Sequence, residues 1–210
     1  MNTINKTARL AGLLYLLLAI VSAFGLVYVP SVILVPSDAA ATAQKLVAQE
    51  SLFRLGFVSN LLAFTINIFV ATLLYKVLAP VGKTPAALMV ILILVGIAIA
   101  MLNELNQFAA LLLAGGGVDL GAFTAEQMQA LAALFLKLYT HGFVIAHIFF
   151  GLWLLPMGYL VIKSGFLPKW IGFLLLIAGV GYVVDFALFF LFPAIPWSVS
   201  EFTFVGEVAL

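Results

Sequence analysis

The residues that could carry chemistry in this sequence are polar side chains placed inside long apolar runs. Eight of these residues stand out: Asn60, Asn103, Glu104, Asn106, Gln107, His147, Tyr182 and Asp185. An ionisable group in a membrane-spanning helix is costly, and it tends to face the interior of a helix bundle or a water-filled cavity. These eight residues are therefore our candidates for a ligand-binding site.

The depth of the polar residues along their helices indicates that they belong together. With about 1.5 Å of rise per residue, several of them fall roughly 10 to 14 Å below the outer ends of their predicted spans. The residues at this depth are Asn60, Asn103, Glu104, His147, Asp185 and Glu207. Asn103, Asn106 and Gln107 share one helix face, and Tyr182 shares another with Asp185. The pattern predicts one polar layer in the outer half of the bundle.

Three classes of protein could use such a layer. The first, which we favour, is a binding or transport bundle in which the layer holds a small polar ligand or a lipid headgroup. The second is an intramembrane hydrolase in which His147, Glu104 and Asp185 bind a metal ion that activates water. The third is a structural or assembly protein without a ligand, because buried amides also serve as interhelical links of about 0.6 kcal/mol each.

The spacing of the candidate residues argues against an enzyme. His141 and His147 are six positions apart, so they point about 120° away from each other on a helix, unlike the i and i+4 pair of a zinc helix. The sequence also contains no Gly-x-Ser-x-Gly, P-loop or Rossmann glycine pattern. We expect no catalytic residue, no resident metal and no cofactor.

The composition indicates whether the protein is surrounded by lipid or by water. Hydrophobic residues make up 66% of the 210 residues, charged residues make up 8%, and the mean hydropathy is +1.29. Such values are typical of an integral membrane protein, since soluble domains carry about 25% charged residues. The net charge of +1 and the scattered basic residues exclude a nucleic-acid partner, and the absence of cysteine excludes disulfides. Membrane lipids are the expected partners, and the oligomeric state stays open.

Apolar runs bounded by proline, glycine and charged residues predict five complete spans. They are Ala8 to Val29, Phe53 to Leu78, Ala86 to Ala114, Tyr139 to Ile162 and Trp170 to Phe192. The first run is too long for the hydrophobic region of a signal peptide, so we interpret it as a span that is not cleaved. Pro30 and Pro36 are expected to end it.

Two polar, alanine-rich stretches and the end of the chain complete the predicted architecture. Asp38 to Glu50 and the segment that begins at Thr124 predict short interfacial helices, the second with a capping box formed with Gln127. Glu201 to Leu210 is apolar but provides only about 15 Å of helix, which predicts a sixth span completed beyond Leu210. The fold class is thus an all-α, polytopic transmembrane helix bundle over residues 1–210: one domain with five full spans, a partial sixth and two external interfacial helices.

The distribution of cations predicts the orientation. One side of the membrane would carry six of them, which are Lys6, Arg9, Lys76, Lys83, Lys163 and Lys169. The other side would carry three, which are Lys45, Arg54 and Lys137. Because cytoplasmic loops are enriched in lysine and arginine, the amino terminus is expected in the cytoplasm and both interfacial helices outside.

Short motifs throughout the chain carry a resemblance to a known family. They include Arg9-Leu10-Ala11-Gly12-Leu13-Leu14-Tyr15-Leu16, Phe53-Arg54-Leu55-Gly56-Phe57, Phe149-Phe150-Gly151, Gly158-Tyr159-Leu160-Val161, Lys163-Ser164-Gly165-Phe166-Leu167-Pro168-Lys169 and Ala178-Gly179-Val180-Gly181-Tyr182-Val183-Val184-Asp185. With these motifs the sequence resembles the domain of unknown function 4386 family of bacterial membrane proteins. The resemblance implies a multi-span protein of the bacterial inner membrane whose carboxy-terminal span continues beyond Leu210, and it implies no activity.

Overall fold

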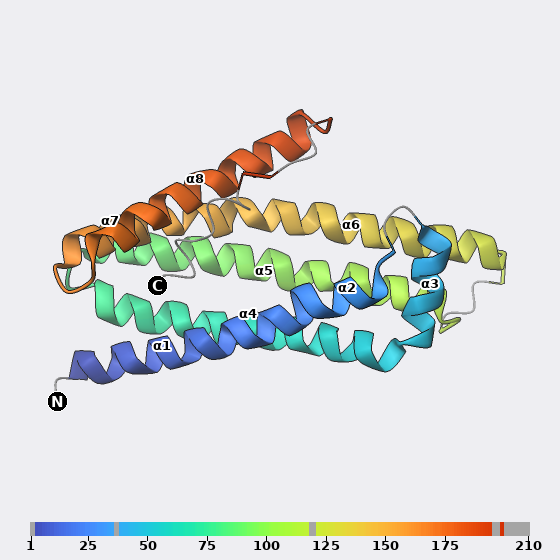
Figure 1. Cartoon of the computed structure of the whole chain (residues 1–210), viewed down its shortest axis with the longest axis horizontal. Coiled ribbons are helices and arrows are strands. Elements are labelled where there is room, and N and C mark those ends of the chain that lie inside the picture. Colours follow the sequence, from blue (N-terminus) through green and yellow to red (C-terminus); the bar gives the residue numbers. More distant parts are fainter. Residues whose placement is uncertain (1–2, 36–37, 118–120, 195–197, 200–210) are drawn as a thin grey trace. The chain divides into compact units, whose positions relative to one another are not determined.

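Every regular element in the described part of the chain is a helix. The computed structural model describes residues 3–35, 38–117, 121–194 and 198–199. In chain order the elements are α1 Thr3–Ser22, the π-helical turn η1 Ala23–Tyr28, α2 Val29–Ile33, α3 Ala39–Ala48, α4 Glu50–Leu78, α5 Lys83–Ala114, α6 Ala125–Leu152, α7 Leu154–Ser164 and α8 Lys169–Leu191 (Figure 1). The predicted all-α fold class is confirmed.

Five helical runs are long and apolar enough to cross a membrane. They are Asn5–Ile33, Glu50–Leu78, Lys83–Ala114, Ala125–Ser164 and Lys169–Leu191. A helix is the form such segments take in lipid, because it satisfies the backbone hydrogen bonds within the segment. The protein is therefore a multi-pass membrane protein. The predicted partial sixth span, with Glu207, lies outside the described residues.

The first span does not end at Pro30, as the sequence led us to expect. The helix continues through Pro30 to Ile33, and the turn before the proline is π-helical instead of α-helical. A proline in an α-helix lacks a donor and clashes with the carbonyl group one turn earlier. A π-helical turn widens that part of the helix, so it can take up the proline without ending the span.

Of the two predicted interfacial helices, one is separate and one is not. α3 is a short helix whose amino terminus is capped by Asp38, which accepts a hydrogen bond from the Ala41 N–H at 2.8 Å. The predicted capping box is also present, since the Thr124 N–H donates to Gln127 Oε1 at 2.8 Å. The helix that starts there continues without a break to Leu152, because no proline or glycine interrupts it before the span begins.

The fourth span consists of two helices. α6 ends at Leu152 and α7 begins at Leu154, with Trp153 between them. The cause is Pro156, which cannot donate a backbone hydrogen bond and would crowd the carbonyl of Leu152 in a continuous helix. The predicted span of Tyr139 to Ile162 thus lies within one apolar run, Ala125–Ser164, that is divided into two helices at Trp153.

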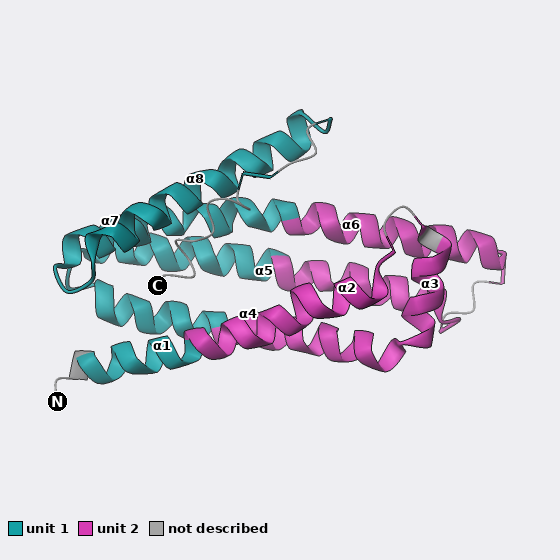
Figure 2. Ribbon diagram, viewed as in Figure 1, with its two compact units in different colours: residues 1–14, 67–99, 144–210 teal, residues 15–66, 100–143 magenta. Residues whose placement is uncertain are grey.

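The residues divide into two compact units, which are coloured separately in Figure 2. Unit 1 comprises residues 1–14, 67–99 and 144–210, and unit 2 comprises residues 15–66 and 100–143. Helices α1, α4, α5 and α6 each contribute residues to both units. The single domain expected from the sequence stays a prediction.

In unit 1, α7 and α8 form a hairpin held at very short range. A Cβ atom at Gly158 would lie 2.7 Å from the carbonyl oxygen of Gly172. A Cβ atom at Gly172 would likewise lie 2.7 Å from the carbonyl oxygen of Gly158. Gly151, near the end of α6, and Gly179 of α8 form a second pair of this kind, at 2.8 Å, which extends the hairpin contact into α6. Small residues of this kind let helix backbones approach closely in membranes. At these two places the hairpin therefore requires glycine.

Unit 2 has its own apolar core, which anchors the short helices. Leu46 of α3, Ile33 of α2 and Phe53 of α4 are buried together with Leu111 of α5 and Ala132 of α6. The burial of apolar area holds α3, which is only ten residues long, against the spans. Three residues of this core, Val29, Ile33 and Phe53, also line the cavity described below.

Candidate functional site

A buried carboxyl group is the centre of the polar cluster in unit 2. Glu104 of α5 is 1% exposed, as is Asn60 of α4. The Asn60 Nδ2 atom donates to Glu104 Oε1 at 3.3 Å and to Oε2 at 3.4 Å, and the Tyr139 hydroxyl of α6 donates to Oε1 at 3.2 Å. Three helices thus meet at one carboxyl group, and no lysine or arginine in the described part of the chain pairs with it.

A second polar link joins α5 to α6 beside the carboxyl group. Asn103 donates from Nδ2 to the backbone carbonyl of Tyr139 at 2.7 Å, and its Oδ1 atom accepts from Asn106 at 2.9 Å. A Cβ atom at Gly142 would collide with the Asn103 amide. Glycine at this position therefore makes room for an asparagine side chain, which in turn fixes the α5–α6 contact around Tyr139.

The π-helical turn of the first span packs against Asn60. A Cβ atom at Gly25 would collide with Asn60 Oδ1 and would lie 3.1 Å from the carbonyl oxygen of Gly56. Within the described residues, Asn60 Oδ1 is buried and has no hydrogen-bond partner. Buried polar atoms are nearly always hydrogen-bonded, so this atom is an exception that needs a physical explanation.

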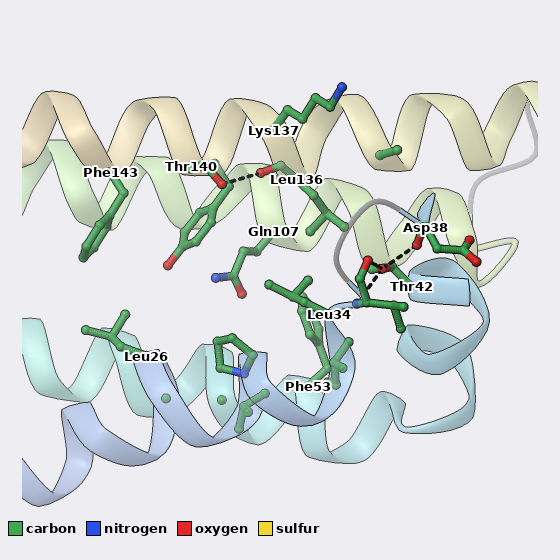
Figure 3. Close-up of a pocket in the computed structure, with 18 residues that line it drawn as sticks. Leu26, Leu34, Asp38, Thr42, Phe53, Gln107, Leu136, Lys137, Thr140 and Phe143 are labelled. Atoms are coloured by element: carbon green, nitrogen blue, oxygen red, sulfur yellow. Dashed lines mark hydrogen bonds between the residues drawn. The ribbon is translucent and has the colours of Figure 1, made fainter. Parts of the chain in front are cut away.

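An elongated, mostly apolar cavity of about 610 Å³ lies within unit 2 (Figure 3). Its apolar walls come from η1, α2, α4 and α6, and include Leu26, Val29, Ile33, Phe53, Leu136 and Phe143. Its polar lining consists of Asp38, Thr42, Gln107, Lys137, Tyr139 and Thr140. Both the volume and the ratio of apolar to polar residues are typical of sites for small molecules.

Gln107 is the polar group at the middle of this cavity. The side chain is 8% exposed, and Figure 3 shows its amide directed into the space between the lining elements, while the amino group of Lys137 points away from it. Tyr139 also lines the cavity, and its hydroxyl reaches Glu104. The cavity therefore offers a neutral amide in an apolar surround, and one of its wall residues contacts the buried carboxyl group.

At one end of the cavity hydrogen bonds of the Thr42 side chain join Val35 and Asp38 to α3. The Thr42 hydroxyl accepts from the Val35 N–H at 3.0 Å and donates to the carbonyl of Asp38 at 2.9 Å. Thr42 is 5% exposed, so these bonds are largely shielded from solvent. They attach Val35 and Asp38 to α3 at this end of the cavity.

The remaining candidates, His147, Tyr182 and Asp185, lie in unit 1. The rings of His147 and Tyr182 meet edge to face with centroids 5.4 Å apart. Asp185 accepts hydrogen bonds from the Ser198 hydroxyl and the Val199 N–H, so it holds these two residues beside α8. Since Asn60, Asn103, Glu104, Asn106 and Gln107 lie in unit 2, a single layer that includes both groups stays a prediction.

Metal ions in proteins are held by several His, Cys, Asp or Glu side chains, and the described residues include His, Asp and Glu. Among them, no three His, Cys, Asp or Glu side chains are grouped so that they could hold a metal ion. The metal-dependent hydrolase considered from the sequence therefore has no ligand set in that part of the chain. The cluster around Glu104 contains one carboxyl group with amide and phenol neighbours instead.

Three important residues of the cluster were not predicted from the sequence. In the sequence Tyr139 was identified only as the first residue of the predicted fourth span, and Gly25 and Gly142 were not singled out. The signal for Tyr139 is weak, because one tyrosine near a helix end is common at membrane interfaces. The two glycines become informative only when the neighbouring asparagine side chains are placed.

The fold and the site define a class: an α-helical, multi-pass membrane protein with a buried polar cluster beside an apolar cavity. More specifically, the chain belongs to the family described as Domain of unknown function (DUF4386), whose match covers residues 10–210. The resemblance noted in the sequence motifs is thereby confirmed.

Other relatives add little about function. The chain is 45% identical over 64 residues to an uncharacterized protein of Archaeoglobus fulgidus. This similarity covers 30% of the chain and 38% of the archaeal protein, so the chain spans well under half the length of that relative. No solved structure matches the chain.

Proposed function

We propose that this protein binds or transports a small ligand or lipid headgroup, and that the cavity in unit 2 is its binding site. The observation that carries the proposal is the Gln107 amide, 8% exposed, which is directed into an apolar cavity of about 610 Å³. A site of this type selects an amphipathic molecule with an apolar body and one uncharged hydrogen-bonding group. The amide can donate to a carbonyl or hydroxyl oxygen and accept from a hydroxyl or amide N–H.

The composition of the cavity wall supports this ligand class over a charged one. The two charged lining residues, Asp38 and Lys137, are exposed, and one oxygen of the Asp38 carboxylate already caps α3. A ligand with an isolated charge would lose its hydration among leucine, isoleucine and phenylalanine side chains without full compensation. An uncharged group needs only the hydrogen bonds that Gln107 supplies.

Native mass spectrometry of the full chain, extracted together with its lipids, tests the proposal. We expect one molecular species to stay bound at one copy per chain. Leu136→Trp fills the cavity and should abolish retention, whereas Leu138→Trp, at an exposed position two residues further on α6 that does not line the cavity, should preserve it. Retention of no species by the wild type, or equal retention by both variants, would contradict the proposal and favour a protein without a ligand.

We also propose that the protein resides in the bacterial inner membrane with its amino terminus in the cytoplasm. The support is the excess of cations on one side, six against three. The sequence lacks cysteine, so single cysteines can be introduced for labelling without background. Cysteines at Gly82 and Ser164 should be labelled from the cytoplasm, and one at Gly116 should be labelled from outside. External labelling at residue 82 would overturn this orientation.

A further inference from the structure

We propose that Glu104 and Asn60 form a binding site for one monovalent cation. The two candidate cations are a proton and a sodium ion. This inference stands apart from the cavity ligand, because it rests on the carboxyl group and on the amide oxygen behind it. Both side chains are 1% exposed, and both belong to membrane-spanning helices.

The first step is the charge balance at Glu104. The carboxyl group receives hydrogen bonds from Asn60 and Tyr139, and both donors are neutral. A buried carboxylate without a cationic partner is strongly disfavoured in a membrane, even when it accepts such bonds. One positive charge at the carboxyl group would remove this penalty, and a single carboxyl group matches a single monovalent cation.

The second step is the orientation of the Asn60 amide. With Nδ2 directed at Glu104, Oδ1 is left against Gly25 without any donor in the described part of the chain. Rotating the amide by half a turn exchanges the two atoms, and Oδ1 then faces the carboxyl group. Two oxygens that face each other repel unless a proton or a metal cation lies between them. The amide orientation and the occupancy of Glu104 are therefore linked.

The third step concerns the groups around the pair. Tyr139 of α6 is the titratable group that contacts Glu104, while α4 presents the Asn60 amide and η1 presents Gly25. Hydroxyl, amide and carboxylate oxygens are the hard ligands that sodium and protons prefer, and no soft ligand is present. The same groups do not suit a divalent ion, which would bring one more positive charge than Glu104 can balance.

Infrared spectroscopy of the full chain in lipid nanodiscs tests the inference. With glutamate labelled by carbon-13 at the side-chain carboxyl, a protonated Glu104 gives a shifted carbonyl band that Glu104→Gln removes. If a proton is the cation, this band is present at about pH 7, where a free glutamate side chain is ionised, and it is equal in sodium and choline chloride. If sodium is the cation, adding sodium at constant pH removes the band, and one radioactive sodium ion binds per wild-type chain.

The variants Asn60→Leu and Asn67→Leu provide the matched comparison. Asn67 lies two helical turns further along α4 and also has a buried amide oxygen without a partner among the described residues. Asn60→Leu should weaken sodium binding roughly tenfold, because sodium loses a ligand oxygen, and should instead strengthen proton binding, because the carboxylate loses a hydrogen-bond donor; Asn67→Leu should change neither. A wild-type Glu104 that shows neither the protonated band nor saturable sodium binding overturns the inference, and so does equal behaviour of the two variants.

Discussion

Unit 1 and unit 2 both depend on glycine, but glycine makes room for different neighbours in the two units. In the α7–α8 hairpin of unit 1, Gly158 and Gly172 each face the backbone oxygen of the other at a distance that excludes a Cβ atom. In unit 2, Gly25 and Gly142 face the amide groups of Asn60 and Asn103 instead. The first arrangement brings two backbones together, whereas the second accommodates polar side chains.

This difference indicates what each unit requires from its sequence. A backbone oxygen cannot move without moving its helix. A methyl group added in the hairpin would therefore push α7 and α8 apart. An asparagine amide is the end of a side chain that can rotate, so the polar cluster of unit 2 can adjust. A site that binds ligands needs such adjustment, and a hairpin that only has to stay closed does not.

The largest expected effect is that of Gly172→Ala in unit 1. The new Cβ atom would lie 2.5 Å from a side-chain carbon of Ile162 and 2.7 Å from the Gly158 oxygen. We expect a loss of roughly 2 to 3 kcal/mol of unfolding free energy, the usual range for overpacking. Gly12→Ala in α1 is the control, because nothing lies within 4 Å of its Cβ position. Unfolding in mixed micelles should show Gly12→Ala at or slightly above wild-type stability.

An intermediate effect is expected for Gly25→Ala in unit 2. The methyl group would displace the Asn60 amide, which can rotate away, so we expect a loss of about 1 kcal/mol. Asn60→Ala removes the obstacle, and the double variant should therefore be more stable than the sum of the single losses predicts. A double-mutant cycle measures this coupling, which we expect to be about 1 kcal/mol. Strict additivity would show that Gly25 is needed for the π-helical turn alone.

The sequence predicts the spans well because their physical cause is local. Length and hydropathy suffice to identify an apolar helix. For the first, second, third and fifth spans, both predicted ends lie within four residues of the ends in the structure. The fourth span is the exception at its start, because its helix begins at Ala125 and not at Tyr139. The other two errors arise at prolines. At Pro30 a π-helical turn keeps the span going, and at Pro156 a continuous span divides into two helices. The outcome at each proline depends on packing that the sequence pattern does not contain.

The candidate site was predicted only in part. Glu104 and Asn60 were identified because polar residues inside apolar runs are conspicuous, and they do hydrogen-bond to each other. Their matching depth also led to the grouping with His147 and Asp185, which the structure assigns to the other unit. Depth along a helix says nothing about rotation around it or about which helices are neighbours. Tyr139 was missed for the same reason, since its hydroxyl contact depends on the pairing of α5 with α6.

The smallest expected effect is that of Tyr139→Phe, and it bears most directly on the function of unit 2. The ring would still line the cavity, and only the hydroxyl would be lost, together with its 3.2 Å bond to Glu104 and its interaction with the Gln107 side chain. Hydrogen bonds between membrane helices contribute about 0.6 kcal/mol on average, so stability should fall by no more than that. Tyr28→Phe, at an exposed position of η1, is the control and should leave stability unchanged.

The second measurement on Tyr139→Phe is cation binding at Glu104. If the polar cluster is retained for binding, the loss of a donor to the carboxyl group should change proton or sodium affinity while stability barely moves. If the cluster instead holds the helices together, stability should fall by several times the average for a membrane hydrogen bond. Comparison with Gly172→Ala then separates two roles. The Gly158–Gly172 contact of unit 1 would serve stability, whereas the hydrogen bond from Tyr139 to Glu104 in unit 2 would serve cation binding.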